Sequence, residues 1–192
     1  MPVELITAAD PLTVVSLQNA KDFLRIDDST ENDLITEIIK AAAVSLEEYT
    51  ERALIPQVYK FYADTFPADD KALEVPVCPL ISVSALQYYT GGVLTTLSSA
   101  AYLVDTQKKP GQIALADGYG WPAVDERPNA VVVSFSAGYA SAALVPRDLR
   151  LGLLLTVAHF WHNRLPYAEG QVREVPGLAC RLVDKYRESY AA

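Results

Sequence analysis

The chain has 192 residues and a formal net charge of −8 at pH 7. Because nonspecific DNA binding depends on cationic side chains that displace counterions from phosphates, 24 acidic residues against 16 basic ones argue against tight DNA binding by the whole chain. Hydrophobic residues make up 51% of the sequence, which excludes a disordered chain and leaves apolar surface for contacts with partners.

Two helices are predicted in the first 56 residues. Ser16 is a favourable N-cap for a short helix over residues 17–24, and Thr30 is expected to cap a longer helix over about residues 31–53. The apolar positions of the longer helix recur at helical spacing: Leu34, Ile35, Ile38, Ile39, Ala42, Leu46 and Tyr49. This is the clearest amphipathic pattern in the chain.

The remaining face of the longer helix is acidic. Six acids accompany one base along it: Glu31, Asp33, Glu37, Glu47, Glu48, Glu51 and Lys40. A solvated helix face is the simpler interpretation. The alternative is a surface that meets a basic partner or lines an acidic channel, where it would keep DNA from adhering.

Residues 57–142 are predicted to form a β-rich segment. Short runs of β-favouring residues are separated by Gly and Pro, which is typical of an antiparallel sheet or a small sandwich. The expected strands cover residues 58–64, 72–75, 81–89, 93–97, 101–104, 112–115 and 130–137. Gly91-Gly92 is expected to form the turn of a hairpin.

Two more helices are predicted in residues 143–192. Pro146 and Asp148 suit the first turn of one helix, and the last helix is expected over about residues 178–190. The predicted fold class is therefore α+β, with N- and C-terminal helices forming a helical bundle and an antiparallel β-rich segment inserted between them. The expected division is 1–56, 57–142 and 143–192.

The sequence contains no phosphate-binding glycine loop and no hydrolase serine elbow. His159 and His162 could share a metal, with Glu169 and Cys180 as conceivable further ligands, but two surface or interface histidines are the simpler interpretation. Cys78 and Cys180 are expected to be buried thiols without a disulfide. No apolar run is long enough to span a bilayer. We therefore expect no catalytic residue, no cofactor, no metal and no membrane partner.

The order and spacing of several motifs resemble those of phage head-tail connector (adaptor) proteins, over about residues 15–188. The motifs cover residues 20–27, 39–42, 46–52, 54–57, 66–67, 77–83, 120–122, 135–139, 145–150 and 161–164. They include Ala20-Lys21-Asp22-Phe23-Leu24-Arg25-Ile26-Asp27 and Gly120-Trp121-Pro122. His162-Asn163 departs from the family pattern, in which a more acidic, tyrosine-type context is expected.

The resemblance implies a structural subunit that catalyses nothing. Such subunits form a ring of about twelve copies below the portal, at the neck of a tailed phage or a gene transfer agent particle. The ring bridges the head to a stopper or tail terminator, and DNA passes through it without specific binding. The implied partners are further copies of this chain, the portal protein and the stopper or tail terminator, with assembly in the bacterial host cytoplasm.

A locally basic stretch near the C-terminus is the candidate portal-docking interface. Its residues are Arg173, Arg181, Lys185, Tyr186 and Arg187. Because weakly packed terminal segments can fold onto a partner, residues 173–192 are expected to dock on the portal. The alternatives are another neck or tail-completion virion protein, a small α+β enzyme or ligand-binding domain with an unrecognised pocket, and a scaffold module unrelated to phage.

Overall fold

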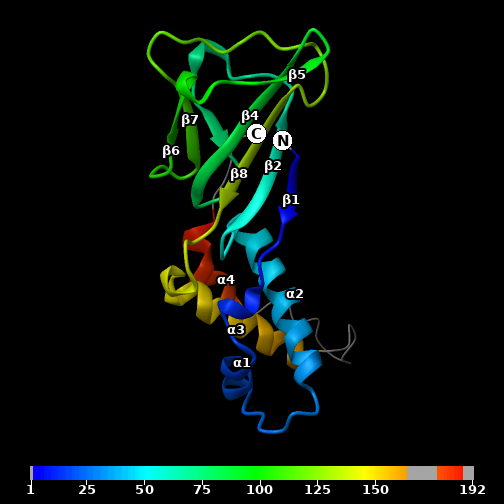
Figure 1. The fold of residues 1–192 in the computed structure, drawn as a ribbon. Coiled ribbons are helices and arrows are strands. Elements are labelled where there is room, and N and C mark those ends of the chain that lie inside the picture. The colour runs from blue at the N-terminus through cyan, green and yellow to red at the C-terminus, as the bar shows by residue number, and fades with distance from the viewer. Residues whose placement is uncertain (1, 164–176, 188–192) are drawn as a thin grey trace. The chain divides into compact units, whose positions relative to one another are not determined.

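The computed structural model describes residues 2–163 and 177–187 (Figure 1). The chain divides into two compact units. In the described residues, the sheet unit consists of 2–9 and 56–140, and the helical unit consists of 10–55, 141–163 and 177–187. The α+β class is confirmed, while the helical bundle and the division into three segments stay predictions.

The larger sheet of the sheet unit has five antiparallel strands in the order β1-β2-β8-β4-β5. These strands are β1 (Val3–Thr7), β2 (Gln57–Ala63), β8 (Val131–Ala137), β4 (Leu80–Thr90) and β5 (Val93–Thr96). The Phe135 ring stacks on Tyr59 at 5.5 Å and meets Phe61 edge-on at 6.1 Å. We call the face that carries these three buried rings the inner face of the sheet.

A smaller sheet has the order β3-β7-β6. Its strands are β3 (Leu73–Val75), β7 (Gly111–Leu115) and β6 (Tyr102–Asp105). Gly111 lies against β4, since a β-carbon at this position would come within 2.5 Å of the Leu80 β-carbon. The two sheets therefore approach each other at a point where only glycine fits.

The predicted hairpin joins β4 to β5. Gly91 and Gly92 have φ values of +57° and +78°, the left-handed conformation that two-residue hairpin turns require. Both of their N–H groups donate to the Asp125 carboxylate at 2.8 Å. The turn is thus held by a side chain from a distant loop.

The helical unit contains α1 (Leu17–Leu24), α2 (Asn32–Thr50), α3 (Arg147–His162) and α4 (Gly177–Val183), coloured from blue to red in Figure 1. Within this unit α3 packs against α1, α2 and α4. The buried apolar side chains of these helices include Ile35, Ile39, Ala42, Leu46, Leu149, Leu153, Val157, Ala179 and Val183. The predicted apolar stripe of α2 accordingly supplies much of the core.

One of the two predicted N-caps is confirmed. The Ser16 hydroxyl accepts the Asn19 N–H at 3.2 Å, as expected for the start of α1. The prediction that Thr30 caps α2 is wrong, because α2 begins at Asn32 with Glu31 at the N-cap. The Thr30 N–H instead donates to the Asp28 carboxylate at 2.8 Å, so the chain makes a tight turn before the helix begins.

Two boundaries differ from the prediction. Residues 3–7, expected in the helical N-terminal segment, form β1 and pair with β2 of the sheet unit. The last helix, expected to reach residue 190, ends at Val183 and continues as a short 3-10 helix over Asp184–Tyr186. Residues 188–190 of that expected helix lie outside the described residues.

Candidate functional site

Four of the five residues of the predicted docking interface lie in the described part of the chain. Arg181 is in α4, Lys185 and Tyr186 are in the 3-10 helix that follows, and Arg187 comes directly after it. Arg173 lies outside the described residues. We call residues 177–187 the C-terminal arm.

The C-terminal arm is packed onto the helical unit. Ala179 is 3% exposed and Val183 is 2% exposed, so both side chains belong to the core. Val183 lies directly against Gly152 of α3. The described arm is therefore folded in the free chain, in contrast to the weakly packed segment that the sequence suggested.

Polar contacts tie the arm to α2. The Tyr49 hydroxyl donates to the Asp184 carboxylate at 2.5 Å, and this hydrogen bond raises the pKa of Tyr49 to about 12. The Arg187 guanidinium lies 5.3 Å from the centre of the Tyr49 ring, within the range of a cation–π contact. One tyrosine of α2 therefore holds two successive parts of the arm.

Two further contacts use residues that the sequence had assigned to portal docking. Lys185 forms an ion pair with Asp148 of α3, and this hydrogen bond raises the pKa of Lys185. The buried Arg52 donates from Nε to the Tyr186 carbonyl. Lys185 and Tyr186 are therefore engaged within the chain, and Arg187 keeps its ring contact with Tyr49. The exposed Arg181 makes no hydrogen bond, ion pair or ring contact with the described residues.

A cavity of about 370 Å³ lies between α2, α3 and α4. Its lining is Ser45, Leu46, Tyr49, Thr156, Ala179, Cys180 and Val183. Because none of these side chains carries a formal charge, the cavity offers little to orient a polar substrate. It is an apolar space at the base of the arm.

The conceivable metal ligands named from the sequence are not brought together in the described residues. These residues contain no group of three or more His, Cys, Asp or Glu side chains that could hold a metal. The half-buried His159 contacts Asn163, and His162 is exposed. Glu169 lies outside the described residues, and Cys180 lines the apolar cavity.

The two cysteines differ in exposure. Neither forms a disulfide; Cys78 is buried and Cys180 is half-buried. The expectation of two buried thiols is therefore correct for Cys78 and only partly so for Cys180. Within the described segments of the chain, no helix combines the length and apolarity that crossing a membrane requires.

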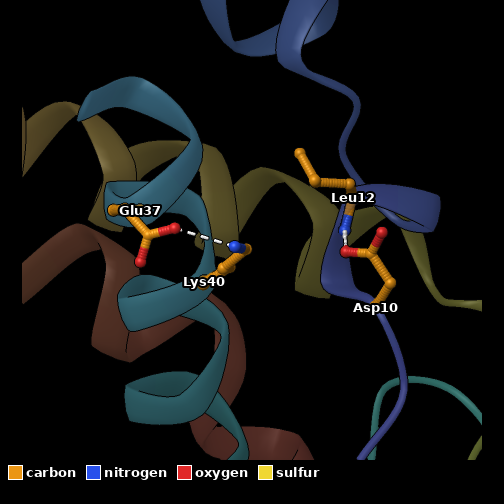
Figure 2. A network of polar contacts seen from close by, with 4 residues as sticks. All are labelled: Asp10, Leu12, Glu37 and Lys40. Atoms are coloured by element: carbon orange, nitrogen blue, oxygen red, sulfur yellow. Dashed lines mark hydrogen bonds and ion pairs between the residues drawn. The ribbon is translucent and has the colours of Figure 1, made fainter. Parts of the chain in front are cut away.

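The acidic face of α2 is solvated over most of its length. Figure 2 shows Lys40 bonded to Glu37 at 2.7 Å, a contact that raises the pKa of Lys40, with Asp10 nearby. In the same view, Asp10 accepts the Leu12 N–H at 3.0 Å and so caps the short 3-10 helix Pro11–Thr13. Asp33 and Glu48 are exposed.

Glu47 departs from this acidic face. Its carboxylate accepts the Leu54 N–H at 2.7 Å and stabilises the chain after α2. The face presented to solvent is therefore formed by the exposed acids Asp33, Glu37, Glu48 and Glu51.

Residues 14–90 match the family model of phage gp6-like head-tail connector proteins. The match begins before α1 and ends with β4, so it includes residues of both units. It contains the motifs at residues 20–27 and 46–52 on which the predicted resemblance depended. The predicted resemblance is confirmed over these residues, while the motifs at 120–122, 135–139, 145–150 and 161–164 lie beyond the match. No curated protein sequence matches this chain.

Three solved structures share the fold over the full length of the chain. A chain of the virion of a native gene transfer agent (GTA) particle is 22% identical with a TM-score of 0.77. A chain in the neck of an empty GTA particle, computed with C6 symmetry, is 23% identical with a TM-score of 0.76. A chain in the neck of a native GTA particle, computed with C12 symmetry, is 22% identical with a TM-score of 0.74. Each likeness covers 100% of this chain and 98% of the other.

Proposed function

We propose that this chain is a head-to-tail connector (adaptor) subunit, which forms a ring of about twelve copies at the neck of a phage or gene transfer agent particle. The observation that carries the proposal is the match of residues 14–90 to the gp6-like connector family. The fold shared with GTA neck chains over the whole length supports the same role for the rest of the chain.

A ring of identical subunits needs two different, complementary surfaces on each copy. The GTA neck computed with C12 symmetry supports the copy number that the family resemblance implies. The subunit bridges the portal and the stopper or tail terminator, and it needs no catalytic residue. The exposed acids of α2, which include Asp33, Glu37 and Glu48, suit a surface that DNA passes without adhering.

Portal docking involves the C-terminal arm, with Arg181 as the exposed cation that makes no hydrogen bond, ion pair or ring contact with other described residues. Lys185 and Arg187 act indirectly, because their contacts with Asp148 and Tyr49 hold the arm in place. Deleting residues 173–192 would remove Ala179 and Val183 from the core, so loss of docking in that variant would not separate binding from folding. A point substitution at the exposed Arg181 is the cleaner test.

The function is tested by removing the gene from cells that produce the particles. We expect filled heads that lack tails, seen by electron microscopy, and restoration of complete particles by the native gene. Complete particles in the absence of the gene contradict the proposal. An enzyme or an unrelated scaffold would leave particle assembly intact.

Docking is tested by binding of purified chain to purified portal. Arg181→Glu is expected to weaken binding at least tenfold, while Arg147→Glu, the same charge change at another exposed site of the helical unit, retains it. Circular dichroism checks that both variants fold. Equal losses in the two variants would indicate an effect of net charge and contradict a role for Arg181.

A further inference from the structure

The five-stranded sheet ends in two open edges, β1 and β5. An edge strand exposes unpaired N–H and C=O groups, which proteins usually protect with charged residues, proline or a bulge. β5 has the sequence Val-Leu-Thr-Thr and carries no charge, and its Val93 is 65% exposed. None of these protective features occurs in β5 itself.

The β1 edge is also apolar. Val3, Leu5 and Ile6 are between 40% and 48% exposed. The single charged residue of the strand, Glu4, accepts a hydrogen bond from the Tyr62 hydroxyl at 2.7 Å and so lies over its own sheet. The strand does carry a bulge between Leu5 and Thr7. In the part of the chain that the structure describes, both edges thus combine apolar side chains with backbone groups that no other strand pairs with.

The hydrogen-bond pattern shows which β5 groups are free. The Leu97 N–H donates to the Leu86 carbonyl at 2.8 Å. Because bonded and non-bonded pairs alternate in an antiparallel ladder, the backbone groups of Leu94 and Thr96 point away from β4. No described residue bonds to them.

The same reasoning applies to β1. The Tyr62 N–H donates to the Pro2 carbonyl at 3.1 Å, so the backbone groups of Val3 and Leu5 point away from β2. Each edge therefore presents two residues, spaced two apart, with free donors and acceptors.

Strand direction restricts how two copies can join. All neighbours in the sheet are antiparallel, so β1 and β5, first and fifth in the order, run in the same direction. In a ring of about twelve copies, the rotation between neighbours is only about 30°, so corresponding strands of adjacent copies stay nearly parallel. The β5 strand of one copy can therefore continue into the β1 strand of the next copy only as a parallel pair.

The side-chain faces fit this parallel pairing. Val3 lies opposite Phe61, and so its side chain is on the inner face, as is that of Val93. In a parallel pair, the residue whose backbone groups bond across the pair faces a residue whose own backbone groups point the other way. A residue of one edge with free backbone groups therefore sits opposite a residue of the other edge that already bonds to its own sheet. Thr96 or Leu94 would thus sit opposite Glu4, and all three side chains are on the outer face. The inner face continues without interruption.

We propose that β1 of one copy adds in parallel to β5 of the next, so that the sheet runs from copy to copy around the ring. This inference rests on the proposed connector function and deepens it by assigning the two complementary surfaces that ring closure requires. The occupant of each edge is a second copy of this chain.

Cross-linking in assembled particles tests the pairing. In a Cys180→Ser background, the variants V3C/V93C and V3C/T95C place thiols on the inner face in the two registers that keep the faces aligned. Mild oxidation of particles is expected to give a ladder of covalent multimers with one of these two double variants, the one whose register matches the pairing. The control E4C/V93C places the thiols on opposite faces of the sheet and is expected to give none.

Single-cysteine particles distinguish other pairings. Multimers from V3C alone or from V93C alone would indicate that like edges meet, which overturns the proposal. Absence of a ladder from both double variants in particles that contain the chain overturns the proposal and leaves the connector function standing. Complete, tailed particles that lack the chain would overturn both.

A backbone variant provides a second readout. Thr96→Pro removes an N–H that β4 does not use, and proline is tolerated at such an edge position. We expect T96P to fold but to abolish ring assembly into particles. Thr96→Ala, which also loses the Gln87 contact but keeps the N–H, is expected to assemble. Assembly of T96P at the native level would contradict the pairing.

Discussion

Val183 of α4 lies so close to Gly152 of α3 that a β-carbon on Gly152 would come within 2.6 Å of the Val183 side chain. Replacing a helix-interior glycine by alanine usually stabilises a helix by about 1 kcal/mol. Here the added methyl overpacks the contact, which costs about 1–3 kcal/mol. We therefore expect Gly152→Ala to leave the free energy of unfolding unchanged or to lower it, as measured by urea denaturation.

The double variant G152A/V183A is the control for this prediction. Truncating Val183 removes the atom that the new methyl would meet, so Gly152→Ala should stabilise the chain when Val183 is already alanine. The coupling between the two substitutions is read from a double-mutant cycle. Additive effects would contradict a direct contact between the two positions.

The Tyr49 hydroxyl makes the packing of the C-terminal arm on α2 sensitive to alkaline pH. Its pKa is raised from 10 to about 12, chiefly by the hydrogen bond to Asp184, so the folded chain holds the proton more tightly than the unfolded chain. This stabilisation is complete below pH 10 and is lost as the pH rises towards 12.

Tyr49→Phe removes that pH dependence. We expect the difference in urea midpoint between the native chain and Y49F to shrink as the pH rises through this range, and Asp184→Asn to lower the pKa of Tyr49. Tyrosinate absorbance, compared between the native chain and Y49F, follows the pKa directly. A midpoint difference that stays constant with pH would contradict the assignment.

Lys21 is a buried lysine that ties the link between α1 and α2. Its ammonium donates to the Asp28 carbonyl at 2.6 Å and to the Asn32 side-chain oxygen at 3.0 Å. Lys21→Met keeps the apolar stem but leaves both acceptors without this donor, which costs about 1–3 kcal/mol. Thermal unfolding measures the loss.

The matched control is Lys40→Met on the exposed surface. Lys40 bonds to Glu37 one turn away, and such solvated pairs contribute little to stability. We expect no measurable change in the unfolding temperature of K40M. Equal changes in unfolding temperature for K21M and K40M would mean that the buried contacts of Lys21 do not stabilise the chain.

Asp125 holds the turn that precedes β5. Asp125→Ala removes the acceptor of the Gly91 and Gly92 N–H groups, and hydrogen bonds to a charged group contribute about 1.5–3 kcal/mol. We expect faster amide hydrogen exchange in residues 91–96 with little change in β2 and β8. Unchanged exchange in the hairpin would show that the two glycines suffice to form the turn.

The strands of the sheet unit could be predicted closely from the sequence because β-branched runs and Gly or Pro turns mark them locally. The Gly91-Gly92 turn is an example. β1 was missed, since five residues at the start of a chain form a strand only when β2, more than fifty residues later, pairs with them. Thr30 was misassigned because its N–H bonds to the Asp28 carboxylate in a turn, and the helix begins only at Asn32.

The candidate site was predicted less well. Composition identified the basic character of the C-terminal arm but not which of its cations are free. That depends on Asp148 and Tyr49, which lie far from the arm in sequence and become neighbours only in the packed helical unit. A local charge count therefore could not separate Arg181 from Lys185 and Arg187.

The unlike edges of the five-stranded sheet have a consequence for how copies accumulate. Each added copy covers one edge and exposes another of the same kind, so growth has no internal stop until the last copy meets the first. If the rotation between copies is not held to a closing value, the same contact produces an endless helical filament. A template that fixes the rotation between copies, such as the symmetric surface of a larger ring, thus decides whether the copies form a closed ring or a filament.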